Sequence, residues 1–151
     1  MKIIIGSDHA GYELKERIKK YLSETDFNYE DLGPNVINPL DDYPDFVIPV
    51  AKKVAENLIE NKGIVVGGSG QGEAIAANKV KGIRAAVYYG GSLEIVKLSR
   101  THNDSNILSL GARFLSEKEA KDAVEVWIKT QFSTEPRHKR RIEKIKKYES
   151  L

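Results

Sequence analysis

Largely apolar segments alternate with amphipathic ones along the whole chain, and this alternation restricts the possible folds more than any other feature. Five segments are predicted to be strands. Four of them are mainly apolar and stop at a glycine or a polar residue, whereas the remaining one is half polar. They are expected at residues 1–7, 27–32, 63–66, 83–89 and 106–111, of which 27–32 is the weakest. Each is followed by apolar residues at helical spacing, which predicts a helix after every strand.

The helices carry specific expectations of their own. Pro44 begins the second helix, whose apolar stripe extends as far as Ile59. The helix after the third strand is expected to include Ile75 and Val80. Residues 134–136, Thr-Glu-Pro, are typical of the cap and first turn of a terminal helix.

Strands and helices therefore alternate five times, and helical crossovers of this length join parallel strands. The sequence predicts an α/β fold, namely a doubly wound, Rossmann-like three-layer sandwich with a five-stranded parallel sheet. With 151 residues and neither a linker nor an internal repeat, the chain is near the commonest size of one compact domain. We therefore expect a single domain spanning residues 1–151.

The composition excludes several kinds of chemistry. No cysteine occurs, which removes disulfides, thiolate nucleophiles and cysteine-bound metals. The three histidines are scattered and no carboxylates pair with them at ligand spacing, so no metal site is expected. The first apolar run is too short for a signal peptide and no stretch approaches the ~18 apolar residues of a spanning helix, so a cytoplasmic location is expected.

Positive charge collects near the end of the chain. The formal net charge is only +2, which by itself does not suggest a nucleic-acid coat. Residues 136–148, however, contain seven Lys or Arg against one Glu. This segment is therefore a candidate anion-binding element.

Polar residues follow three of the predicted strands. Asp8 and His9 follow the first strand, residues 67–73 follow the third, and Arg113 comes just after the fifth. In doubly wound sheets, ligands bind beyond the carboxyl ends of the strands, where the chain switches direction. We expect these three groups to line one crevice.

The loop at residues 67–73, GGSGQGE, has four glycines and leads from a strand into a helix. Such a turn places backbone N–H groups at the positive end of a helix dipole, which favours an anion near the main chain. It is neither a dinucleotide fingerprint, which would follow the first strand, nor a P-loop, which needs Gly-Lys-Ser or Gly-Lys-Thr. The alternatives are a tight turn whose glycines only permit close packing, and a Glu73 placed for the helix dipole alone.

Six separated motifs together resemble one enzyme family. They are GSDHAGYELK, DDYPDF, GGSGQGEAIAANKVKGIRAA, THNDSN, GARF and PRHKRRIEKI, and they span nearly the whole chain in order. The resemblance is to ribose-5-phosphate isomerase type B, in a wider family that includes galactose-6-phosphate isomerase subunits and isomerases of four-carbon sugar phosphates. It implies an aldose-ketose isomerase that interconverts ribose 5-phosphate and ribulose 5-phosphate.

One departure from the family pattern concerns the catalytic base. In many members a cysteine at the position of Gly67 removes the C2 proton, whereas another branch has a glutamate later in a GSGNGE-like loop. This chain's GSGQGE fits the glutamate branch, which makes Glu73 the expected base. The absence of cysteine independently excludes a thiolate.

The chemistry of isomerisation assigns further roles to the glycine loop. Moving a proton between C2 and C1 requires a base and donors that stabilise the enediolate oxygens. Glu73 can be the base, and the Ser69 hydroxyl with nearby backbone N–H groups can form the anion hole. The loop residues expected to contact substrate are Gly68, Gly70, Gln71 and Gly72. Neither a metal nor an organic cofactor is required.

The resemblance implies how the sugar ring is opened. Ring opening moves a proton from the anomeric hydroxyl to the ring oxygen, a task that suits His102 near neutral pH. The family pattern assigns it to His102, with Asp8 assisting, Tyr43 nearby and Asn103 bonding a sugar hydroxyl. Without the resemblance, His102 and Asp8 could simply cap helix ends, and Tyr43 could be a packing residue.

The phosphate is expected to meet several cationic side chains. Arg137 and Arg141 are four residues apart on one predicted helix, so both guanidinium groups can reach one phosphate. The family pattern adds Arg113 and His9. Because members of the family are dimers with shared sites, the terminal helix, about 134–149, is expected to pack on a partner subunit of a homo-oligomer.

Two other classes of function stay open at this point. One is an isomerase of a different sugar phosphate, such as a tetrose phosphate, allose 6-phosphate or galactose 6-phosphate. The other is a phosphate- or nucleic-acid-binding module that uses the basic terminal helix. The basic segment lacks the interleaved aromatic residues of a protein that binds single-stranded nucleic acid. No binding to a membrane is expected.

Overall fold

The computed structural model describes residues 1–150, which contain one five-stranded sheet. Its strands are β1 (Lys2–Ser7), β2 (Tyr29–Asp31), β3 (Asn61–Gly67), β4 (Ala85–Tyr88) and β5 (Ile107–Gly111). They lie in the order β2-β1-β3-β5-β4, and every neighbouring pair is parallel. The prediction of a five-stranded parallel sheet is confirmed.

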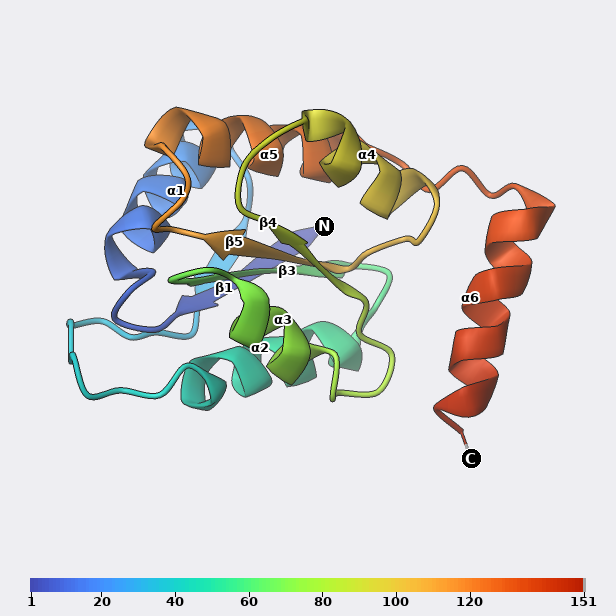
Figure 1. Cartoon of the computed structure of the whole chain (residues 1–151), viewed down its shortest axis with the longest axis horizontal. Coiled ribbons are helices and arrows are strands. Elements are labelled where there is room, and N and C mark those ends of the chain that lie inside the picture. Colours follow the sequence, from blue (N-terminus) through green and yellow to red (C-terminus); the bar gives the residue numbers. More distant parts are fainter. Residues whose placement is uncertain (151) are drawn as a thin grey trace.

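Helices cover both faces of the sheet, as Figure 1 shows. They are α1 (Tyr12–Glu24), α2 (Pro44–Glu56), α3 (Gln71–Ala77), α4 (Leu93–Thr101), α5 (Glu117–Lys129) and α6 (Pro136–Tyr148). Helices α1, α4 and α5 lie on one face, and α2 and α3 lie on the other, so the three-layer sandwich is confirmed. Helix α6, drawn in red, stands apart from the layers at the side of the sheet.

The apolar central strands explain the two layers of helices. Ile3, Ile4 and Ile5 of β1 are completely buried. Successive side chains of a strand point to opposite faces of the sheet, and here helices cover both faces. Ile3 and Ile5 pack in the core beneath α1 and α5, whereas Ile4 packs in the core beneath α2. A strand covered on both faces must be apolar at every position, which is the pattern the sequence has.

Two predicted helices end earlier than their apolar spacing suggested. Helix α2 ends at Glu56, and Ile59, expected in its apolar stripe, is 86% exposed. Helix α3 ends at Ala77, so Val80 lies beyond it, and Ile75 on the helix is exposed. Val80 still packs against the core from its loop position, which is why the apolar spacing continued past the helix.

The expected start of the terminal helix was also partly wrong. Pro136 is the first helical residue, but Glu135 rather than Thr134 occupies the cap position, without a side-chain cap hydrogen bond. Thr134 adopts a positive φ of 58°, a turn conformation. Helix α6 buries only His138 and Ile142, which explains why it stands apart from the layers.

The strand order fixes where the chain switches direction. From β1 the chain moves outward to β2, and from β3 it moves in the opposite direction, first to the edge strand β4 and then back to β5. Ligand sites of doubly wound sheets lie beyond the carboxyl ends of the strands at this point. No helix among residues 1–150 has both the length and the apolar character needed to span a membrane.

Candidate active site

A crevice of about 460 Å³ opens beyond the carboxyl ends of β1, β3 and β5. It is lined by residues from four loops or helix starts: Asp8, His9, Ala10, Tyr43, Gly68, Ser69, Gly72, Glu73, Arg113 and Phe114. The expectation that the polar groups after these three strands line one crevice is confirmed. Parallel strands bring them together because all their carboxyl ends lie at the same edge of the sheet.

The Glu73 carboxyl lies against the backbone of Gly67. Glu73 is in the first turn of α3 and is only 4% exposed. A Cβ atom added to Gly67 would lie 1.8 Å from Oε1 of Glu73 and 2.1 Å from its Cδ. The carboxyl thus occupies the space that any side chain at position 67 would need. Glycine at this position is what allows the close approach.

This geometry gives a physical account of the departure at position 67. A cysteine side chain there would point into the volume that the Glu73 carboxyl fills. A glutamate on α3 and a cysteine at the end of β3 can therefore deliver a basic atom to nearly the same place. The two cannot be present together without displacing the carboxyl.

Burial raises the pKa of the Glu73 carboxyl above its ordinary value, and the nearby charge of Asp8 raises it further. Backbone N–H groups of Glu73 itself and of Gly70 oppose the shift. Desolvation has the largest effect on the pKa of Glu73, so it outweighs the lowering of that pKa by the N–H groups at the start of α3. A carboxylate whose pKa is raised is a stronger base once ionised.

The loop between β3 and α3 is held in one conformation. Gly70, the residue before α3, has a φ of 78°, and its carbonyl accepts a hydrogen bond from the Ser109 hydroxyl at 2.6 Å. The Ser69 hydroxyl accepts the backbone N–H of Gln71 at 3.3 Å, which leaves its own proton to donate. The Gln71 side chain is exposed and is not part of the crevice lining.

Asp8 lies at the end of β1 and is buried. Its Oδ1 accepts the backbone N–H of Gly11 at 2.9 Å, just before α1. The alternative that Asp8 caps α1 does not hold, because the cap residue is Gly11 and it has no side-chain cap hydrogen bond. The bond between Asp8 and Gly11 uses only Oδ1, and Asp8 also lines the crevice together with Glu73.

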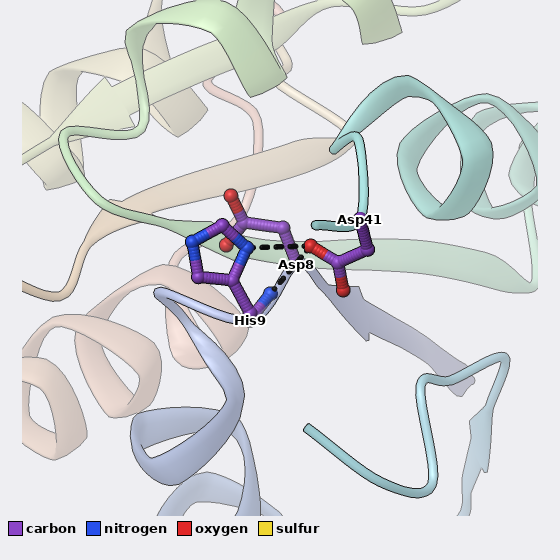
Figure 2. Close-up of side chains that lie close together, drawn as sticks. All are labelled: Asp8, His9 and Asp41. Atoms are coloured by element: carbon purple, nitrogen blue, oxygen red, sulfur yellow. Dashed lines mark hydrogen bonds and ion pairs between the residues drawn. The ribbon is translucent and has the colours of Figure 1, made fainter. Parts of the chain in front are cut away.

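His9 is paired with a carboxylate that the sequence analysis did not select. Figure 2 shows its Nδ1 directed at Asp41, and the distance to Asp41 Oδ1 is 2.6 Å. The backbone N–H of His9 donates to the same oxygen at 3.1 Å. Asp41 is the first residue of the DDYPDF motif, which was the only signal of it in the sequence.

This grouping corrects one expectation. The sequence predicted that no carboxylates would accompany a histidine at ligand spacing, yet Asp8, His9 and Asp41 each place one donor atom within 4.8 Å of the others. The three converge because the loop after β1 meets the loop before α2, which sequence spacing does not reveal. One of the donor pairs is already a hydrogen bond between His9 and Asp41.

Tyr43 and Arg113 complete the crevice. A Cβ atom added to Gly72 would lie 2.8 Å from Cζ of Tyr43, so the phenol ring lies against the start of α3. One added to Gly68 would lie 3.4 Å from the Arg113 guanidinium carbon. The glycine loop is therefore covered partly by the protein's own side chains.

Six of the predicted site residues do not line the crevice within residues 1–150: Gly70 and Gln71 lie at the start of α3, and four others lie on separate elements. His102, Asn103, Arg137 and Arg141 do not line the crevice among the described residues. His102 and Asn103 follow the last residue of α4. The two arginines are on α6, which lies on the side of the sheet away from the loop between β1 and α1 (Figure 1). Arg137 instead pairs with Glu135 at 2.9 Å on the protein surface.

His138 was left unassigned by the sequence analysis but links the two elements of this second group. Its ring centroid is 4.2 Å from that of His102, and its Nδ1 is 2.8 Å from the Ser133 hydroxyl. Burial lowers the pKa of His138, and the neighbouring His102 and Arg137 lower it further. One histidine pair thus joins the end of α4 to the start of α6.

The chain belongs to the ribose/galactose isomerase family, whose model matches residues 3–145. It is 44% identical to the probable ribose-5-phosphate isomerase B of Mycoplasma genitalium, over 97% of this chain and 95% of the relative. It is 40% identical to the ribose-5-phosphate isomerase B of Mycobacterium tuberculosis, over 99% of this chain and 90% of the relative.

Solved structures agree with this membership. The crystal structure of ribose-5-phosphate isomerase B from Mycoplasma genitalium with bound ribulose-5-phosphate superimposes with a TM-score of 0.94 at 43% identity. The match covers 99% of this chain and 96% of the other. The Rossmann-like fold is therefore confirmed, and so is the resemblance inferred from the six motifs.

Proposed function

We propose that this protein is an aldose-ketose isomerase that interconverts ribose 5-phosphate and ribulose 5-phosphate through a cis-enediolate. The observation that carries the proposal is the buried Glu73 carboxyl against Gly67 in the crevice. It is supported by membership of the ribose/galactose isomerase family and by the ribulose-5-phosphate bound to the Mycoplasma relative.

In the proposed reaction, Glu73 takes the proton from C2 and returns it to C1. The electron pair of the C2–H bond forms the enediolate double bond while the π pair of the C1 carbonyl moves to O1. When the C2 carbonyl forms, the double-bond pair takes the proton at C1. The proton of the C2 hydroxyl moves to O1, so no net oxidation occurs. The Ser69 hydroxyl and the backbone N–H groups of residues 70–72 stabilise the enediolate oxygens. The rigid loop around Gly70 supports this role because donors that are already oriented need no rearrangement during the reaction.

The phosphate of the substrate is proposed to lie at the end of the crevice formed by Arg113 and His9. Two further guanidinium groups, Arg137 and Arg141, are proposed to come from α6 of a second copy of the chain. What supports this is that α6 is poorly packed on its own chain and stands away from the crevice. A homodimer would place it on the neighbouring subunit.

Ring opening is assigned to His102 of the second copy, with Asn103 beside it and with Asp8 in the crevice. Within one chain His102 lies at the end of α4, outside the crevice lining. The contact of His102 with His138 holds the end of α4 next to α6, which supports a place for both at one shared site. A cytoplasmic location stays a prediction from the sequence.

The assignment of the base is tested with Glu73→Gln. Isomerisation in heavy water should place deuterium at C2 of ribose 5-phosphate, and the variant should slow this exchange by roughly 10²- to 10⁴-fold. Glu94→Gln is a matched control, because Glu94 is an exposed glutamate in the first turn of α4. Exchange at a near-normal rate in Glu73→Gln would eliminate Glu73 as the base.

The substrate is tested by comparing sugar phosphates of four, five and six carbons. The highest kcat/KM is expected for ribose 5-phosphate. A higher value for a tetrose phosphate, allose 6-phosphate or galactose 6-phosphate would move the assignment to that sugar. A protein that bound these phosphates without converting any of them would be a binding module.

A further inference from the structure

The contact between His9 and Asp41 has two hydrogen bonds to one carboxylate oxygen, which is more than a single charge contact between two side chains. One oxygen of Asp41, Oδ1, accepts both the backbone N–H of His9 at 3.1 Å and its ring Nδ1 at 2.6 Å. The Asp41 side chain is only 7% exposed, whereas that of His9 is 30% exposed. A buried carboxylate therefore holds a partly exposed imidazole at both its main chain and its ring.

The position of Asp41 is itself fixed by a turn. The backbone N–H of Asp41 donates to the carbonyl of Asn38 at 3.0 Å, and the Asn38 side chain accepts the N–H of Leu40 at 3.1 Å. Two residues later Tyr43 begins the approach to α2 and lines the same crevice. The carboxylate of Asp41 therefore reaches the end of β1 from a segment whose own conformation is restrained.

The second oxygen of Asp41 lowers the stability of the folded protein. Oδ2 is buried and has no hydrogen-bond partner among residues 1–150. A buried carboxylate oxygen without a partner is unfavourable for stability. A contact that only stabilised the fold would not need a charged group here, because a smaller neutral acceptor could bond the His9 backbone.

The pairing determines which ring nitrogen is available. A neutral imidazole has one N–H, and donation from Nδ1 to Asp41 leaves Nε2 as the second functional atom. Figure 2 shows this second nitrogen on the side of the ring away from Asp41. Because His9 lines the crevice and Asp41 covers its Nδ1 side, Nε2 is the nitrogen that can meet a ligand.

We propose that Asp41 is a positioning residue that holds the His9 ring with its proton on Nδ1, so that Nε2 faces the crevice and contacts the substrate's phosphate. This inference rests on the proposed function and adds a residue to it. One proton between Nε2 and a phosphate oxygen completes the hydrogen bond, whether the ring or the phosphate carries it. Arg113, which also lines the crevice, contributes the fixed positive charge.

The kinetic test uses Asp41→Asn, which removes the charge and retains the shape. We expect KM for ribose 5-phosphate to rise roughly 10- to 100-fold, with kcat changed less than about threefold, because a contact remote from the reacting carbons is equally strong in the ground and transition states. The inhibition constant of inorganic phosphate should rise by the same factor. An unchanged KM, or a rise in KM without a change for inorganic phosphate, would overturn the proposal.

A matched control and a double-mutant cycle isolate the route through His9. Asp45→Asn changes a carboxylate in the same segment that is exposed and forms no side-chain hydrogen bond with the described residues, so KM should stay as in the wild type. In a His9→Ala background, adding Asp41→Asn should change KM no further. If the two effects add, Asp41 does not act through His9.

The ring itself can be observed without any enzyme assay. The chain has only three histidines, so long-range ¹H–¹⁵N spectra can resolve each imidazole. With the ring neutral, His9 should carry its proton on Nδ1 in the wild type and populate both tautomers in Asp41→Ala. An Nε2-protonated His9 in the wild type would refute the inference. Absence of isomerase activity in a wild type with the expected tautomer would instead refute the proposed function.

Discussion

Replacing Gly67 with alanine tests the central geometric feature of the site. The added Cβ atom would lie 1.8 Å from Oε1 of Glu73 and 2.1 Å from its Cδ. Carbon and oxygen atoms that are not bonded are comfortable at about 3.5 Å, so the carboxyl must move by about 1.5 Å or more. The three nearest atoms all belong to the end of the Glu73 side chain, which can swing into the open crevice.

Activity and stability should therefore respond in opposite ways. A displacement of this size takes the base out of reach of C2, so kcat should fall roughly 10²-fold or more. The backbone of Gly67 is not in the left-handed region, and alanine there restricts the unfolded chain, so Tm should stay constant or rise slightly. Steady-state kinetics with ribose 5-phosphate and thermal denaturation measure the two effects.

Gly11→Ala provides the matched contrast. A Cβ atom at Gly11 would lie 2.1 Å from the carbonyl oxygen of Val66 and 2.9 Å from the backbone nitrogen of Gly67. Main chain in β3 cannot move aside as a side-chain tip can, so this variant should lose about 1–3 kcal/mol or more of stability. A Gly67→Ala protein with normal kcat, or one as unstable as Gly11→Ala, would refute the reasoning.

Three further predictions concern the same site. Glu73→Gln should raise Tm at pH 7, because the raised pKa of Glu73 means that ionising this carboxyl in the folded protein costs stability. The gain in Tm should vanish at about pH 4, below the ordinary pKa of glutamate, where the carboxyl is protonated in both the folded and the unfolded chain. A Tm difference that does not change with pH would contradict this. Gly67→Cys added to Glu73→Ala should restore at least about tenfold of the kcat lost in Glu73→Ala and make it sensitive to a thiol-blocking reagent, unless the two base positions differ. Reassociation of equal amounts of Glu73→Gln and Arg137→Ala should recover about a quarter of wild-type activity, because about half the dimers are mixed and each then has one intact site of two; an inactive mixture would place the whole site in one chain.

The fold and most of the residues that line the crevice could be predicted. They follow from local sequence patterns and from the rule that ligands bind at the carboxyl ends of parallel strands. Apolar runs such as Ile3 to Ile5 identify strands that are buried on both faces. The parallel arrangement then brings Asp8, the glycine loop and Arg113 to one edge. The helix ends were predicted less well, because Val80 packs against the core from a loop and so imitates a helical residue.

The positions of Asp41 and His138 could not be predicted, because each depends on a contact between separate segments. Asp41 lies 32 residues from His9 in the sequence, and only the meeting of two loops pairs them. His102 and His138 come together because α6 returns to the end of α4. Sequence spacing contains no information about either approach.

The sequence by itself determined the alternation of strands and helices, the bare glycine loop and the absence of any cysteine, since these are properties of neighbouring residues. Only the tertiary structure decided that the Glu73 carboxyl fills the space beside Gly67. It also decided that desolvation raises the pKa of this carboxyl more than the N–H groups at the start of α3 lower it. The reason is physical: a pKa and a close contact depend on what surrounds an atom from every direction, and most of those surroundings come from distant parts of the chain.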